Sequence, residues 1–65
     1  MDEKEKTIIK AKVFISDQNP KAALKILTKA LEKYKEDPAI LTELSVAYEL
    51  LGDFDKSKES LEKAI

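Results

Sequence analysis

The chain contains no cysteine and no histidine. These absences remove the thiolate nucleophiles, the most common general base and most ligands of transition metals. The single glycine cannot build a phosphate-binding loop. Ser57 and Ser60 have no base to activate them. We therefore expect no enzyme activity, no metal, no cofactor and no small-molecule substrate, and the lack of disulfides fits a cytoplasmic location.

Arginine and long apolar runs are also missing. All 12 basic residues are lysines, and with 13 acidic residues they give a net charge of −1. The planar guanidinium group is the usual reader of phosphates and guanine edges, so we expect no nucleic-acid partner. No apolar run approaches the roughly 18 residues of a membrane span. The charged start of the chain, Met1–Lys6, is unlike a signal peptide, so we expect no membrane association.

An internal repeat is the most informative feature that is present. Lys29-Ala30-Leu31 returns 34 residues later as Lys63-Ala64-Ile65. The same offset relates Phe14 to Tyr48 and Leu27 to Leu61. A period of this length is typical of a helical hairpin written twice.

Caps and breaks between apolar stretches predict four helices. Asn19 and Asp37 each precede a proline, a combination that starts a helix with a capping side chain. Gly52 is suited to the left-handed position that ends a helix. No segment alternates with a period of two, so we predict an all-α fold of two stacked antiparallel hairpins. The predicted helices span about residues 2–16, 20–35, 38–51 and, after the cap Asp53, 54 to the chain end.

The third predicted helix is apolar over most of its circumference. This pattern indicates a helix packed between neighbours on more than one side. We expect Tyr48 from this helix and Leu27 from the second helix to lie in the core. The apolar arc comprises Ile40, Leu41, Leu44, Ala47, Tyr48 and Leu51, with Val46 and Leu50 on its flank.

The second half of the chain resembles the tetratricopeptide repeat family. Gly52-Asp53-Phe54 is similar to the Gly-Asp-Tyr turn of the family, and small residues at Ser45 and Ser57 stand where its two helices approach closely. The first half is a weaker match, because Gln18-Asn19-Pro20 replaces the turn with a central glycine. The chain is thus interpreted as one domain, residues 1–65, with a degenerate repeat at about 4–37 and an incomplete one at about 38–65. Further matching positions are Ala11, Phe14, Ala23, Leu27, Ala30, Leu41, Leu44, Tyr48, Leu61 and Ala64.

The resemblance implies a non-catalytic scaffold that binds a protein or peptide in a concave groove lined by the first helix of each repeat. One family activity is a clamp on C-terminal carboxylates, but only Lys12 is basic at the corresponding places. The apolar residues favour an apolar or amphipathic helix instead. The predicted groove residues are Ile8, Lys12, Ile15, Thr42, Val46, Glu49 and Leu50, with Glu5, Ser16 and Ala39 beside them.

Four alternatives to groove binding remain open from the sequence. The apolar groove residues Ile8, Ile15, Val46 and Leu50 can simply be buried by packing within the fold. The chain can be a homo-oligomer whose hairpins stack between copies, with Ile8, Ile15, Leu61 and Ile65 among the contacts. It can be a piece of a longer solenoid or a designed chain. It can also be a generic four-helix array outside the family.

Overall fold

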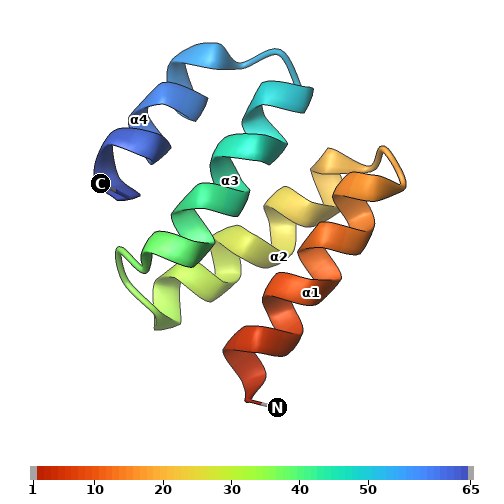
Figure 1. Ribbon diagram of the computed structural model, residues 1–65, viewed down its shortest axis with the longest axis vertical. Coiled ribbons are helices and arrows are strands. Elements are labelled where there is room, and N and C mark those ends of the chain that lie inside the picture. The colour runs from red at the N-terminus through yellow and green to blue at the C-terminus, as the bar shows by residue number, and fades with distance from the viewer. Residues whose placement is uncertain (1, 65) are drawn as a thin grey trace.

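The computed structural model describes residues 2–64 and contains four helices with no strand in that range. The helices are α1 (Glu3–Ser16), α2 (Pro20–Lys33), α3 (Pro38–Leu50) and α4 (Phe54–Ala64). They form two hairpins, α1–α2 and α3–α4, which lie side by side in Figure 1. The prediction of an all-α fold of two hairpins is confirmed.

Each predicted capping side chain is in place. The side chain of Asn19 accepts a hydrogen bond from the backbone N–H of Ala22 at 3.4 Å. Asp37 accepts from Ala39 and Ile40 at 3.0 and 3.3 Å, and Asp53 accepts from Lys56 at 3.2 Å. These bonds satisfy N–H groups that have no partner within the first turn of a helix. Helices α2, α3 and α4 therefore begin where the sequence predicts.

Two helices end earlier than expected. Helix α2 stops at Lys33 rather than near Lys35, and Leu51 is the C-cap of α3 rather than its last helical residue. The early end of α2 follows from the turn into the next helix. Glu36 adopts a left-handed conformation with φ +54°, and Asp37 is extended, as a residue before a proline usually is.

The turns that close α1 and α3 have the same geometry. At the end of α3, Gly52 has φ +83° and the N–H of Asp53 donates to the carbonyl of Tyr48 at 2.9 Å. At the end of α1, Gln18 has φ +60° and the N–H of Asn19 donates to the carbonyl of Phe14 at 2.8 Å. This is the Schellman arrangement of a helix end. The first repeat thus keeps the turn of the second repeat while placing a glutamine at the left-handed position.

Helix α3 is the centre of the molecule. It packs against each of the other three helices, and among the described residues the backbone of α4 approaches that of α3 alone. In Figure 1, α3 lies between α2 and α4. The sequence-based prediction of a helix packed between neighbours is confirmed. The buried residues of α3 are Ile40, Leu41, Leu44, Ser45 and Ala47.

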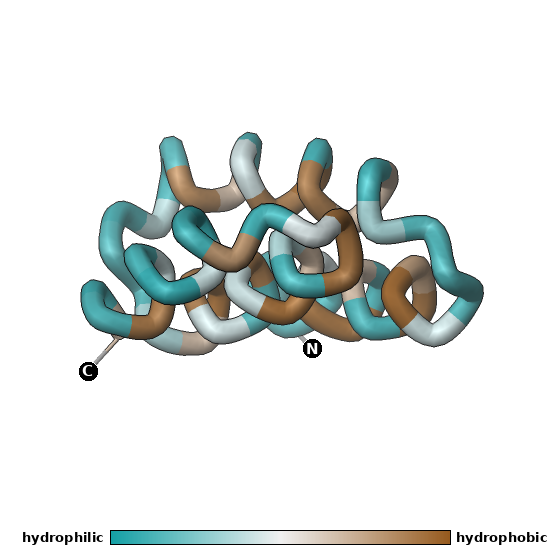
Figure 2. Tube along the Cα trace, turned by 90° about the horizontal axis from the view of Figure 1, so that it is seen from above, coloured by the Kyte–Doolittle hydropathy of each residue, from teal (hydrophilic) through white to brown (hydrophobic). Residues whose placement is uncertain are grey.

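The core is small and is drawn from helices α1, α2 and α3. Leu27 and Ile40 are its largest fully buried side chains. Tyr48 was expected in the core, but it is only half-buried and packs on the edge of the core cluster. The molecule is flat, with extents of 31 × 26 × 15 Å. Figure 2 shows apolar segments spread along this thin molecule. Several large apolar side chains stay exposed, among them Val13, Leu50 and Phe54.

Candidate interaction surface

The predicted groove residues lie on α1 and α3, which contact each other directly. These are the first helices of the two hairpins, and each of them also packs against α2. The structure therefore brings the two parts of the predicted site together on neighbouring helices. None of the predicted groove residues lines one of the larger hollows in the described part of the chain.

Burial divides the predicted groove into two classes. Ile8 and Ile15 of α1 are half-buried and pack against the core cluster. They thus contribute to the fold itself. The remaining residues are exposed: Lys12, Thr42, Val46, Glu49 and Leu50.

Val46 and Leu50 form the apolar part of the exposed set. The side chain of Val46 is 36% exposed and that of Leu50 is 52% exposed. Because they are four residues apart on one helix, they lie one turn apart on the same face. Thr42, one turn before Val46, turns its hydroxyl back to the carbonyl of Pro38 at 2.8 Å.

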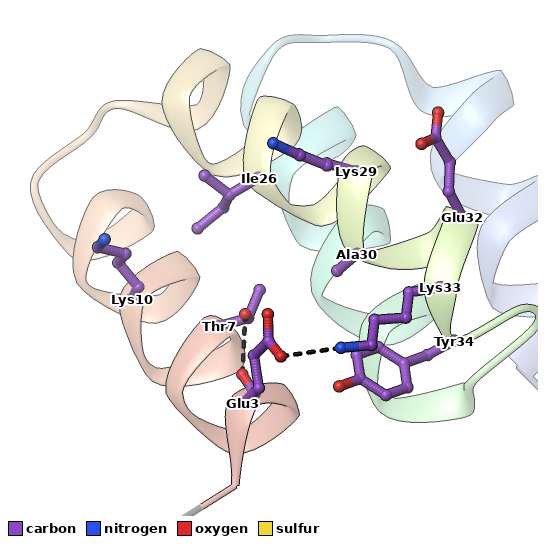
Figure 3. A pocket seen from close by; sticks show the side chains of 9 residues that line it. All are labelled: Glu3, Thr7, Lys10, Ile26, Lys29, Ala30, Glu32, Lys33 and Tyr34. Atoms are coloured by element: carbon purple, nitrogen blue, oxygen red, sulfur yellow. Dashed lines mark hydrogen bonds and ion pairs between the residues drawn. The ribbon is translucent and has the colours of Figure 1, made fainter.

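A hollow that the sequence did not reveal lies between α1 and α2 (Figure 3). Its volume is about 550 Å³. An ion pair between Glu3 and Lys33 crosses its mouth at 2.8 Å, and the Lys33 ammonium also lies 5.4 Å from the centre of the Tyr34 ring. The hollow depends on two residues 30 positions apart, so no local sequence pattern could have indicated it. It is lined by Glu3, Thr7, Lys10, Ile26, Lys29, Ala30, Glu32, Lys33 and Tyr34.

Two ion pairs join the start of α1 to the C-terminal end of α2 and to the α2–α3 turn. Lys33 lowers the pKa of Glu3, and Glu3 in turn raises the pKa of Lys33. The Lys4 ammonium lies 2.8 Å from the Asp37 carboxylate. Asp37 raises the pKa of Lys4, and Lys4 lowers the pKa of Asp37. The backbone N–H groups of Ile40 and Ala39 lower the pKa of Asp37 further. These charges are paired within the fold, which leaves the hollow with mixed charge rather than a field of one sign.

Another, smaller hollow of about 250 Å³ is bounded by α2, α3 and α4. Tyr48 lines it, and the Lys56 ammonium lies 5.7 Å from the centre of the Tyr48 ring. Tyr48 is half-buried because it lies at this hollow on the edge of the core rather than inside it. Among residues 2–64, no group of three or more acidic side chains is placed to hold a metal ion.

The two hairpins share a pattern of small buried residues. In both hairpins small residues stand where the paired helices approach: Ala11 and Ala23 are fully buried in the first, and Ser45 and Ser57 are buried in the second. The sequence model of the tetratricopeptide repeat family matches residues 14–65. The chain belongs to the tetratricopeptide repeat family.

Tetratricopeptide repeats generally mediate protein–protein interaction or scaffolding and are typically non-catalytic. Comparison of the chain with curated proteins and with solved structures found no match. No helix within residues 2–64 is long and apolar enough to cross a membrane. The division into repeats at 4–37 and 38–65 stays a prediction.

Proposed function

We propose that this tetratricopeptide chain binds an apolar or amphipathic helical segment of a protein partner on the face formed by α1 and α3. The observation that carries the proposal is the exposure of Val46 and Leu50. They lie on α3, whose opposite side forms the centre of the core. Their backbone is therefore held rigidly, while their side chains remain available to a partner.

The chemistry around Val46 and Leu50 supports a helix as the ligand. Two apolar side chains one turn apart match the spacing of the i and i+4 anchors on an amphipathic helix. Lys12 and Glu49 are exposed on the two helices of this face, so it carries both signs of charge. Those charges suit the mixed polar flank of such a helix better than a carboxylate or a polyanion.

The test is a titration of the isotope-labelled chain with an amphipathic model peptide that bears leucines at positions i, i+3, i+4 and i+7. We expect the largest amide shift changes around Val46 and Leu50. Val46→Asp and Leu50→Asp should each abolish binding, because a carboxylate would have to be desolvated under the peptide. Ile9→Asp is the matched control, since Ile9 is also exposed but lies on α1 outside the predicted groove. Shift changes confined to α4, or loss of binding in the Ile9 variant, would contradict the proposal.

A further inference from the structure

Leu27 and Leu61 occupy the same position in successive repeats but differ completely in burial. Leu27 of α2 is 0% exposed, whereas Leu61 of α4 is 43% exposed. Leu27 is covered because α3 packs against α2 and places Ile40 in the same core cluster. The second hairpin therefore repeats a helix-docking surface, and within residues 2–64 nothing occupies it.

The uncovered face of α4 is an apolar strip with one lysine. Phe54 is 66% exposed and Leu61 is 43% exposed. They are seven residues apart, or about two turns, and so lie on one side of the helix. Lys58 stands between them and is also exposed. Ser57, one turn before Leu61, and Ser60 are buried against the rest of the fold, so the apolar strip borders the packed side of α4.

The N-terminal edge of the molecule does not complement this strip. Helix α3 docks on the first hairpin through Ile40 and Leu44, but 34 residues earlier α1 carries Lys6 and Lys10 instead. Head-to-tail stacking would thus bury ammonium groups against Leu61, which is unfavourable without a partner charge. This mismatch at the positions of Ile40 and Leu44 disfavours an open chain of copies.

The α4 face is complementary to its own copy. Lys58 and Glu62 are exposed, lie one turn apart and border the same side of Leu61. When two helices pair antiparallel about a two-fold axis, each flank meets the same flank of the other helix in reversed order. In such a pair Lys58 lies opposite Glu62 of the second copy, next to the Leu61 side chains.

We propose that the Phe54–Lys58–Leu61 face of α4 is a self-association surface, through which two copies of the chain form a two-fold dimer with antiparallel α4 helices. This surface is separate from the α1–α3 face, so the dimer leaves Val46 and Leu50 available. The proposal goes beyond the proposed function, and each can fail without the other.

Sedimentation equilibrium of the 65-residue chain at several loading concentrations tests the dimer. We expect a monomer–dimer equilibrium for the parent chain and a monomer at all loadings for Leu61→Asp. Val13→Asp is the matched control, because Val13 is a similarly exposed apolar residue on α1 and its variant should dimerise like the parent. Circular dichroism confirms that each variant is folded.

Exchanging the charges of residues 58 and 62 tests the antiparallel arrangement. It also tests the dimer if the Leu61→Asp variant fails to fold. Lys58→Glu and Glu62→Lys should each weaken dimerisation by roughly tenfold, since each puts like charges opposite one another twice per dimer. The double variant Lys58→Glu/Glu62→Lys should restore the parent dissociation constant. A parent chain that is monomeric at every loading, a Leu61→Asp dimer, or a double variant no better than the single variants would overturn the proposal.

Discussion

The hydroxyl oxygens of Ser45 and Ser57 lie 2.9 Å apart in the buried contact between α3 and α4. The equivalent positions of α1 and α2, 34 residues earlier, hold Ala11 and Ala23, both fully buried. Each hairpin thus keeps its helices close with a pair of small side chains. The second hairpin adds one hydrogen bond, which satisfies two hydroxyl groups that would otherwise be buried without a partner.

This pairing predicts non-additive effects of substitution. Ser45→Ala or Ser57→Ala alone should destabilise the chain by about 1–3 kcal/mol, because the remaining hydroxyl loses its partner. The double variant reproduces the Ala11–Ala23 contact and should cost less than the sum of the two single variants. Urea unfolding followed by circular dichroism measures all three. Additive losses would show that the hydroxyl pair contributes nothing as a pair.

Truncation of Leu27 should be severe. Leu27→Ala removes a fully buried side chain and should cost about 2–5 kcal/mol. That is comparable to the low end of the roughly 5–15 kcal/mol that stabilises a domain. Leu50→Ala is the control, since Leu50 is half-exposed and its truncation should cost below about 1 kcal/mol. Thermal melts of the two variants would contradict the assigned core if they were shifted equally.

The left-handed positions Gln18 and Gly52 should respond in opposite directions to a change of residue. Gly52→Ala should destabilise by about 1 kcal/mol from backbone strain alone, because a Cβ at Gly52 would meet no atom within 4 Å. Gln18→Gly should be neutral or stabilising by up to about 1 kcal/mol, since it relieves the same strain at φ +60°. Unfolding free energies of both variants are the measurement. A neutral Gly52→Ala variant would be inconsistent with the left-handed turn.

The Lys4–Asp37 contact predicts a loss of stability in acid. Lys4, and then the backbone donors, lower the pKa of Asp37 below its ordinary value of 3.8. The stabilising contribution is therefore complete above pH 3.8 and is lost as the pH falls through the lower pKa of the folded state. Unfolding free energy measured between neutral and acid pH should fall in this window for the parent chain.

Two substitutions separate the two roles of Asp37 in this acid response. Asp37→Asn retains a capping side chain, so it should reduce the pH dependence and cost little beyond the ion pair. Asp37→Ala removes the cap as well and should cost about 0.5–2 kcal/mol more. Glu3→Gln is the control for a fully exposed pair, and it should change stability little because both Glu3 and Lys33 are largely in water. An unchanged acid response in Asp37→Asn would assign the transition to other carboxylates.

Much of the architecture could be predicted from the sequence because its determinants are local. Asn19, Asp37 and Asp53 cap their helices through bonds to residues two or three positions away. Gly52 adopts its left-handed conformation within one turn. Such signals do not depend on what packs against the helix, so the helix starts, the hairpins and the family were all predicted correctly.

The candidate surfaces were less accessible to prediction. The sequence placed Ile8, Ile15, Val46 and Leu50 on one apolar groove, but the fold half-buries the first two and leaves the others exposed. The sequence likewise placed Tyr48 in the core, but the structure leaves it half-buried at the core edge, with the Lys56 ammonium near its ring. Each outcome depends on the angle at which a neighbouring helix crosses, and the periodicity of a single helix does not encode that angle.

The repeat pair Leu27 and Leu61 shows where the division falls. The sequence by itself determined that both are leucines on the apolar side of a helix, at the same place in a tetratricopeptide unit. Only the tertiary structure decided that one is fully buried and the other 43% exposed. Helical periodicity is a property of a segment and its neighbours in the chain. Burial depends on a second helix supplied from elsewhere, and α3 supplies one for Leu27 but not for Leu61.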